Sequence, residues 1–266
     1  MRIITCALQC EAQAFIDHFS MKSILNHPFK IHQKNDILLI ISGIGKLNMA
    51  AACAYVYAKF NNPVCSWLNI GICGARKKPI GSIFIANKVS ADFSMLYGYP
   101  PLIIKTEIES SPLITVDQPT ENYKNNNIYD MEAAGFYATC IKFTTTELVS
   151  CLKVVSDNEQ QSIKNIDKNY VHELMGNALS SILTYFDQQN ELLQEYQLEK
   201  QTPVYYHELT TAFHFTKTQQ HQLKKALDRL TLNSNNDINI ELNKYSNAKQ
   251  VLQYLDNLLT LQKVKL

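Results

Sequence analysis

The placement of polar residues after apolar runs constrains the fold of this chain most. Three short β-like runs each end in a polar or glycine-rich element: Met1–Leu8 before Gln9–Glu11, Ser66–Ile70 before Gly71–Ala75, and Leu148–Val155 before Ser156–Asn158. In open α/β sheets, ligands bind outside the carboxyl ends of the strands. We therefore expect Glu11, the glycine segment and Asp157 to meet at one pocket, with Glu132 joining them from the start of a helix.

Residues 1–186 alternate between strand-like and helix-like patterns, which is typical of an α/β domain. The expected strands are Arg2–Leu8, Asp36–Ser42, Cys65–Ile70, Gly81–Val89, Leu113–Val116 and Leu148–Val155. The expected helices are Glu11–Phe19, Leu47–Phe60, Asp130–Phe143 and Tyr170–Phe186, with Asp130 as a helix N-cap.

The composition changes after residue 186, where glutamine, asparagine, lysine and leucine dominate and glycine is absent. Amphipathic helices are predicted over Gln219–Leu230 and Ser246–Leu259, with a loop at Asn233–Asn236 and a strand at Ile238–Leu242 between them. We therefore expect two parts: an α/β domain over residues 1–186, and a small, mostly helical C-terminal extension over residues 187–266.

Charge and cysteine content narrow the class of protein. The net charge of +1 offers no basic patch for nucleic acid. No apolar run reaches the roughly 18 residues of a membrane span, and the N-terminus lacks the pattern of a signal peptide. The seven cysteines mostly lie in apolar runs, as reduced buried thiols do, and their spacing predicts no metal site. We expect a cytoplasmic protein without nucleic-acid or membrane partners.

Taken singly, each polar motif has an ordinary structural explanation. Ser42–Lys46 fails both nucleotide-binding glycine templates and is better read as a strand-to-helix turn. Asp157 could cap a helix, Glu132 could be favoured by the helix dipole, and Glu11 could be an exposed residue at a helix start. The functional hypothesis therefore depends on their combination.

In combination, these elements resemble the nucleoside phosphorylase superfamily, and most of all its methylthioadenosine/S-adenosylhomocysteine nucleosidase branch. The resemblance runs in order over residues 1–185. It is carried by Ala7–Glu11, Ser42–Ala50, Asn69–Ala75, Ile80–Ile83, Asp130–Ala134 and Val155–Asp157. It implies a three-layer, phosphorylase/hydrolase-like fold, with a central mixed β-sheet flanked by helices.

The resemblance also implies cleavage of the N-glycosidic bond of a purine nucleoside, of adenine type or 5′-modified. Asp157 would donate a proton toward purine N7, and Glu11 would orient and deprotonate the attacking water. Glu132 would accept hydrogen bonds from the ribose hydroxyls. The remaining implied contacts to substrate are Met131 on the sugar face, the glycine segment Gly71, Ile72, Cys73 and Gly74 beneath the sugar, and Ser156 beside Asp157. Family members need no metal or organic cofactor, and homodimers are common among them.

Alternatives remain open at the level of sequence. Phosphorolysis, a glycosyltransferase reaction with phosphate as co-substrate, would need cationic groups such as Arg76, Lys77 or Lys78. Glu11 would repel phosphate, so hydrolysis is preferred. The chain departs from the family pattern at Ile72, where a serine is expected, and in a shortened segment between Phe93 and Asp130. The other alternative to hydrolysis is a non-catalytic nucleoside-binding or scaffold protein. The C-terminal helices are candidates for binding a protein partner.

Overall fold

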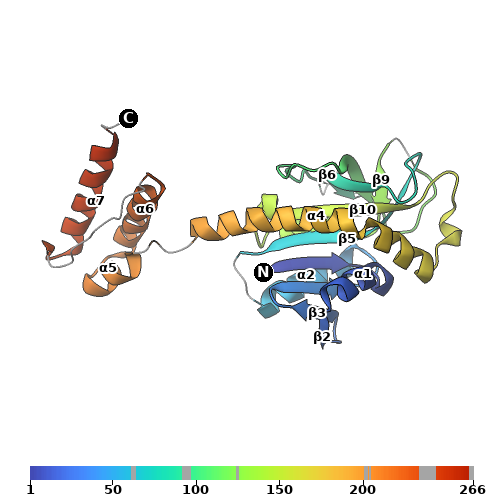
Figure 1. Ribbon diagram of the computed structural model, residues 1–266, viewed down its shortest axis with the longest axis horizontal. Coiled ribbons are helices and arrows are strands. Elements are labelled where there is room, and N and C mark those ends of the chain that lie inside the picture. The colour runs from blue at the N-terminus through green and yellow to red at the C-terminus, as the bar shows by residue number, and fades with distance from the viewer. Residues whose placement is uncertain are drawn as a thin grey trace. The chain divides into compact units, whose positions relative to one another are not determined.

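A computed structural model describes residues 1–60, 64–91, 97–123, 126–200, 203, 205–233 and 244–263. The chain divides into two compact units, Met1–Gln197 and Leu198–Leu266. Within the described residues, no helix has the length and apolar character needed to span a membrane. Figure 1 shows the elements of both units.

The first unit contains ten strands and four α-helices in the part of the chain that is described. The strands are β1 (Arg2–Cys6), β2 (Lys22–Leu25), β3 (Lys30–Lys34), β4 (Ile37–Ile41), β5 (Ser66–Ala75), β6 (Ile83–Ala91), β7 (Tyr97–Gly98), β8 (Glu109–Thr115), β9 (Ile128–Asp130) and β10 (Val149–Asp157). The helices are α1 (Gln9–Phe19), α2 (Lys46–Phe60), α3 (Ala133–Cys140) and α4 (Lys168–Lys200), the last of which runs a few residues past the end of the unit.

The ten strands form one mixed sheet that closes on itself at one side. Nine of them follow the order β10-β6-β8-β9-β5-β1-β4-β3-β2, β7 pairs with β6, and β10 also pairs with β5. The strands β5, β10, β6, β8 and β9 therefore form a closed ring, from which β1 to β4 extend as an open sheet. The expected mixed sheet flanked by helices is confirmed.

Strand direction places the candidate residues at one edge of the sheet. β4, β1, β5 and β10 are parallel to their neighbours in this series, so their carboxyl ends share an edge. β1 pairs with β5 only as far as Thr5 and Asn69, whereas β9 pairs with β5 at Gly74 and Ala75. The stretch of β5 between these two partners is open on the β1 side, which leaves room for a site.

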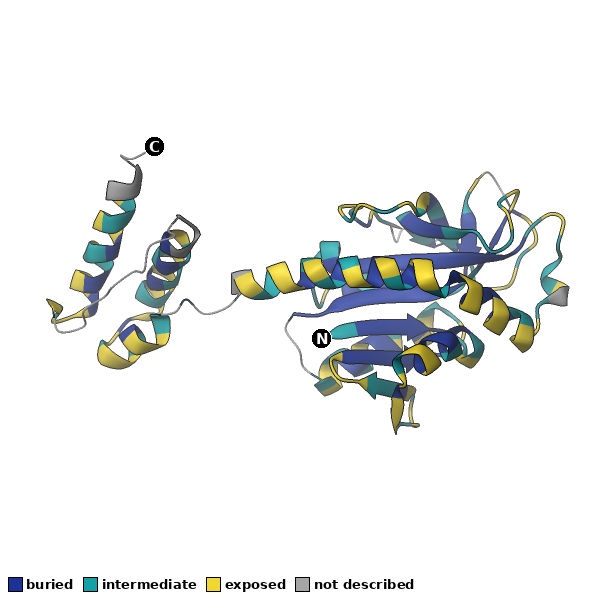
Figure 2. Ribbon diagram, in the orientation of Figure 1, coloured by how far each residue is buried: buried dark blue, intermediate teal, exposed yellow. Residues whose placement is uncertain are grey.

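The helices cover the two faces of the sheet, each over its own apolar cluster. One cluster joins α2 and α3 to the sheet through residues such as Met49 and Phe136. The other joins α1 and α4 through residues such as Phe15 and Ile182. The continuous aliphatic run of β4 fits this arrangement, because its residues alternate between the two clusters and the strand is therefore covered on both faces. Figure 2 shows the central strands as buried and α4 as buried along one side.

Several predicted boundaries differ from the structure for identifiable reasons. The strand predicted over Cys65–Ile70 continues to Ala75, because β10 and β9 pair with the glycine segment. The helix predicted from Asp130 begins at Ala133, because Asp130 ends β9; its carboxylate still accepts the Ala133 N–H at 2.8 Å. The exposed hairpin of β2 and β3 was not predicted.

The second unit is a small helical body with its own core. It contains α5 (Tyr206–Ala212), α6 (Lys217–Asn233) and α7 (Ala248–Lys263). Leu223, Leu227, Val251 and Leu255 are among the apolar side chains buried between them. The expected boundary at residue 187 falls inside α4, and the unit begins instead at Leu198. The loop and strand predicted over residues 234–242 lie outside the described residues, and a protein partner for this unit stays a prediction.

Candidate active site

A cavity of about 270 Å³ opens at the carboxyl ends of β1, β5 and β10. The predicted residues that line it are Glu11, Ile72, Cys73, Gly74, Met131, Glu132, Ser156 and Asp157. The structure thus brings together eight of the nine residues selected from the sequence. The ninth, Gly71, lies behind Glu11 rather than on the cavity wall.

Glu11 is held in place by backbone amides. Its Oε2 accepts the N–H groups of Ala7 and Leu8 at 2.9 and 2.8 Å, and its Oε1 accepts the Ile72 N–H at 3.0 Å. Ile72 lies on β5 beyond the end of the pairing with β1, so the carboxylate satisfies an amide that the sheet leaves open. Burial raises the pKa of Glu11 above its ordinary value, although Lys153 and these amides act in the opposite direction.

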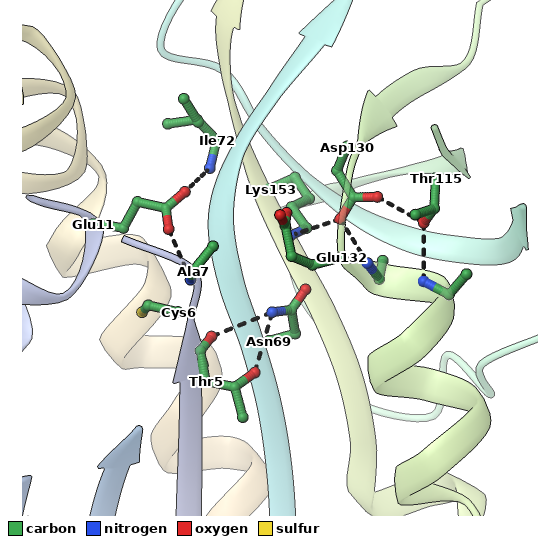
Figure 3. Close-up of polar contacts among 12 residues, drawn as sticks. Thr5, Cys6, Ala7, Glu11, Asn69, Ile72, Thr115, Asp130, Glu132 and Lys153 are labelled. Carbon is green, nitrogen blue, oxygen red and sulfur yellow. Dashed lines mark hydrogen bonds and ion pairs between the residues drawn. The ribbon is translucent and has the colours of Figure 1, made fainter. Parts of the chain in front are cut away.

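Glu132 lies beside a buried ion pair. Lys153 Nζ contacts Asp130 Oδ2 at 2.9 Å, and both side chains are almost fully buried. Thr115 donates its hydroxyl to Asp130 Oδ1 at 2.7 Å, and Glu132 Oε1 accepts the Gly45 N–H at 2.7 Å. Figure 3 shows Lys153, Asp130 and Glu132 gathered together and Glu11 directed at Ile72.

The pKa values of this cluster follow from burial and charge. Burial, and then the nearby Asp130 carboxylate, raise the pKa of Glu132 to about 7. Burial alone would lower the pKa of Lys153, but Asp130, Glu132 and Glu11 together raise it above its ordinary value. Lys153 therefore stays charged and Glu132 is poised between its two forms near neutral pH.

Asp157 is held by hydroxyl groups. Ser156 donates its hydroxyl to Asp157 Oδ1 at 2.6 Å, and Tyr123 donates its hydroxyl to Asp157 Oδ2. The Asp157 residue is 2% exposed. Both oxygens of this carboxyl group therefore have a partner, and neither partner is a cation.

The two glycines of β5 make room for carboxylates. A Cβ atom at Gly71 would lie 2.8 Å from Glu11 Oε1, and one at Gly74 would lie 2.7 Å from Asp157 Oδ2 and from Tyr123 Oη. Any larger residue would force these groups away from the strand. The glycine segment was predicted to admit a ligand; its observed effect is to admit the acidic side chains that face the cavity.

No protein-family model matches the sequence, and no curated protein matches it. Solved structures do match. The 5′-methylthioadenosine nucleosidase of Arabidopsis thaliana is 13% identical with a TM-score of 0.57, over 71% of this chain and 95% of that chain. The 5′-methylthioadenosine/S-adenosylhomocysteine nucleosidase from S. pneumoniae is 17% identical with a TM-score of 0.58, over 70% and 98%. A futalosine hydrolase mutant of Helicobacter pylori is 15% identical with a TM-score of 0.54, over 70% and 98%.

The chain has the fold of these nucleosidases. Their chains are covered almost completely, whereas about three tenths of this chain is not matched. The second unit, Leu198–Leu266, is close in length to the share of the chain that is not matched.

Sequence reasoning missed two residues of the site on this nucleosidase fold. Lys153 is the only charged residue in β10 before Asp157, and a buried lysine needs a charged partner, so its position in an apolar strand was a usable signal. Tyr123 lies between β8 and β9, outside any motif. Val116, Pro119 and Thr120, from the same shortened segment, also line the cavity. Among the described residues, no cluster of three or more His, Cys, Asp or Glu is arranged to hold a metal ion.

Proposed function

We propose that this protein hydrolyses the N-glycosidic bond of a purine nucleoside, of adenine type or carrying a 5′ modification. The observation that carries the proposal is the meeting of Glu11, Glu132 and Asp157 at one cavity from separate parts of the chain. Each has a different environment, which suits three different tasks. The nucleosidase fold supports the proposal.

Asp157 is the proposed general acid. Cleavage of the glycosidic bond leaves negative charge on the purine, and a proton delivered to N7 makes the base a better leaving group. A positioned general acid typically contributes about 10²–10⁴-fold in rate. Asp157 is buried at the end of β10, where Ser156 and Tyr123 contact its carboxyl group. It lines the cavity, so it can contact the purine of a bound nucleoside.

Glu11 is the proposed base for water. A carboxylate offers about four lone-pair sites, and backbone amides occupy three of those on Glu11, which leaves one on Oε1 for a water molecule. Its raised pKa makes it a stronger base than an exposed glutamate. The water loses a proton to Glu11 and its oxygen bonds to the anomeric carbon, while the base leaves with the proton from Asp157.

Glu132 is the proposed holder of the ribose. Its Oε1 is engaged by Gly45, and the second oxygen can accept hydrogen bonds from the sugar hydroxyls. Met131 lines the cavity beside it and can pack on the sugar face. A carboxylate at this place also stabilises the positive charge that develops on the ribosyl group.

The surroundings of the cavity favour hydrolysis over phosphorolysis. Among the described residues that line it, none is arginine or lysine. Arg76 pairs with Glu159 at 2.7 Å, and Lys78 lies over the ring of Phe84 at 3.7 Å. Two of the three cations considered for phosphate are thus engaged elsewhere, and Glu11 would repel an anion.

The proposal is tested by chromatographic detection of free base. The panel contains methylthioadenosine, S-adenosylhomocysteine, 5′-deoxyadenosine, adenosine and inosine, each with and without phosphate, and Asp157→Asn serves as the blank. Release without phosphate is the expected result. Release only with phosphate would make the protein a phosphorylase. No release from any nucleoside would leave a binding or scaffold protein as the better account.

A homodimer is part of the proposal. Ile44 and Leu47 are apolar yet 51% and 80% exposed, and Ile44 also lines the cavity. Such side chains suit an interface beside the site better than a solvated surface. Light scattering should give twice the chain mass, and Leu47→Asp should shift the protein to monomer. A wild-type monomer at micromolar concentration would contradict the dimer.

A further inference from the structure

Tyr123 stands out because it contacts the base end of the cavity, here defined as Asp157, Ser156 and Gly74. Its hydroxyl contacts Asp157 Oδ2, and its ring lies against Gly74. The ring centroid is 5.5 Å from that of Tyr129, a cavity-lining residue. Tyr123 is 6% exposed. The residue is therefore fixed by packing on two sides, and its polar end reaches one carboxyl oxygen.

The two hydroxyl contacts set the orientation of the Asp157 carboxyl group. Ser156 bonds Oδ1 and also reaches the Cys73 carbonyl oxygen at 3.2 Å, which ties that side to β5. Tyr123 bonds Oδ2 from the segment between β8 and β9. With one oxygen held from each side, rotation of the carboxyl group is restricted.

Tyr123 approaches Asp157 from outside the cavity. Asp157 and Gly74 line the cavity wall, whereas Tyr123 does not. The phenol therefore leaves the cavity face of the carboxyl group accessible to a ligand. Burial, and then the hydrogen bond to Asp157, raise the pKa of Tyr123 above its ordinary value, so the phenol keeps its proton and acts as a donor.

We propose that Tyr123 is a positioning residue for the catalytic acid: its phenol orients the Asp157 carboxyl group and stabilises the negative charge that forms there as the proton passes to the base. This inference rests on the proposed function. A hydrogen bond donated to a carboxylate favours its charged form, so it favours the state in which the acid has given up its proton. The phenol itself stays neutral, and the only proton transferred is the one that leaves Asp157.

The segment between β8 and β9 contributes to the site in two ways. That segment supplies cavity wall through Val116, Pro119 and Thr120, and it supplies the partner of the acid through Tyr123. The same segment thus contributes both to the shape of the base end and to the chemistry of its carboxyl group.

Tyr123→Phe is the direct test, because it keeps the ring against Gly74 and removes only the hydroxyl. The matched control is Tyr185→Phe, which removes another buried hydroxyl that pairs with Ser150 at 2.8 Å and lies outside the cavity lining. We expect kcat for base release to fall about 10-fold in Tyr123→Phe, with KM changed less than about 2-fold, since the contact matters most as charge develops. Tyr185→Phe should leave both constants unchanged.

The contact can also be observed without turnover. In protein labelled with ¹³C at the tyrosine Cζ, the Tyr123 signal is the one absent from Tyr123→Phe, and it should move in Asp157→Asn. An unmoved signal would overturn the pairing. A fall in KM at unchanged kcat in Tyr123→Phe would also overturn the inference, because the phenol would then compete with the substrate. If the wild-type protein released no base while the signal moved in Asp157→Asn, the pairing would stand and the proposed function, with the catalytic role of Tyr123, would fall.

Discussion

The two ends of the cavity are built in different ways. At the end proposed to hold the sugar, here called the sugar end and formed by Glu11, Glu132 and Met131, the carboxylates are held by backbone amides of Ala7, Leu8, Ile72 and Gly45. At the base end, Asp157 is held by side-chain hydroxyls of Ser156 and Tyr123. Backbone amides are present whatever the sequence, whereas hydroxyl groups depend on two particular residues.

The sheet therefore supplies the groups that hold Glu11, whereas substitutions can remove the groups that hold Asp157. The amides that hold Glu11 come from the end of β1 and from β5, so any chain with this sheet offers them. Of the two hydroxyls that hold Asp157, one comes from Tyr123 in the segment between β8 and β9, outside the regular elements of the sheet. Under the proposed function, we therefore expect substitutions to change base specificity more easily than the binding of the sugar.

The largest expected effect is at the base end. Asp157→Asn keeps the shape of the side chain and removes the transferable proton, and its single amide oxygen can accept only one of the two hydroxyls, those of Ser156 and Tyr123. We expect kcat to fall by about 10²–10⁴-fold with a modest change in KM, because the proton is needed mainly in the transition state. Steady-state base release measures both constants, and Asp187→Asn, an exposed site on α4, is the control. A large rise in KM at normal kcat would contradict the assignment of Asp157 as the acid.

The same contrast explains which parts of the site could be predicted. Glu11, Glu132 and Asp157 each follow a strand or open a helix, and parallel strands bring such positions to one edge, so local pattern was sufficient. Lys153 could have been suspected, but its partner Asp130 comes from β9, a strand of three residues that has no clear alternation. Tyr123 has no local signal at all, because its role exists only once Asp157 is folded against it.

The fold could also be predicted only in part from the sequence. β4 and β10 were recognised because fully buried strands read as continuous apolar runs. β2 is exposed over most of its length, so its sequence carries no core pattern. The start of α3 was misplaced by three residues, because Asp130 serves both as the end of β9 and as an acceptor for the first helical N–H.

The next largest effect concerns the ion pair that supports the sugar end. Lys153→Met removes the cation and leaves the Asp130 carboxylate buried without its charged partner. We expect the free energy of unfolding of the first unit to fall by about 3–5 kcal/mol, as breaking one side of a buried pair typically does. Denaturant unfolding followed by the fluorescence of Trp67, a buried residue of β5, reports on this unit.

A double variant sharpens this prediction. Adding Asp130→Asn to Lys153→Met removes the unpaired charge and should recover part of the lost stability. Lys142→Met, at an exposed position after α3, is the control and should change stability by less than about 0.5 kcal/mol. A loss below about 1 kcal/mol in Lys153→Met would show that Asp130 finds other partners and that the pair does not support the sugar end.

The smallest expected effect is a gain in the free energy of unfolding, in the variant Glu132→Gln. Glu132 ionises near its ordinary value of 4.5 in the unfolded chain and near 7 in the folded one. Between these values the folded state binds more protons, so this residue lowers the free energy of unfolding as pH rises from 4.5 to 7, and the loss persists above 7. Glu132→Gln removes that penalty and keeps an oxygen for the Gly45 N–H. We expect the variant to be more stable than wild type at pH 8 by up to about 3 kcal/mol, with little difference at pH 4.5.

The nucleoside affinity of Glu132→Gln should decrease, in contrast to its stability. The glutamine offers no negative charge to the ribose, so nucleoside affinity by calorimetry should fall while stability at pH 8 rises, as expected where a site is kept at the expense of stability. Glu191→Gln, at an exposed position on α4, is the control for both measurements. A Glu132→Gln protein that is less stable than wild type at pH 8 would show that the carboxylate is structural. The sugar end would then resemble the base end, where the residues that hold the acid also maintain the local packing.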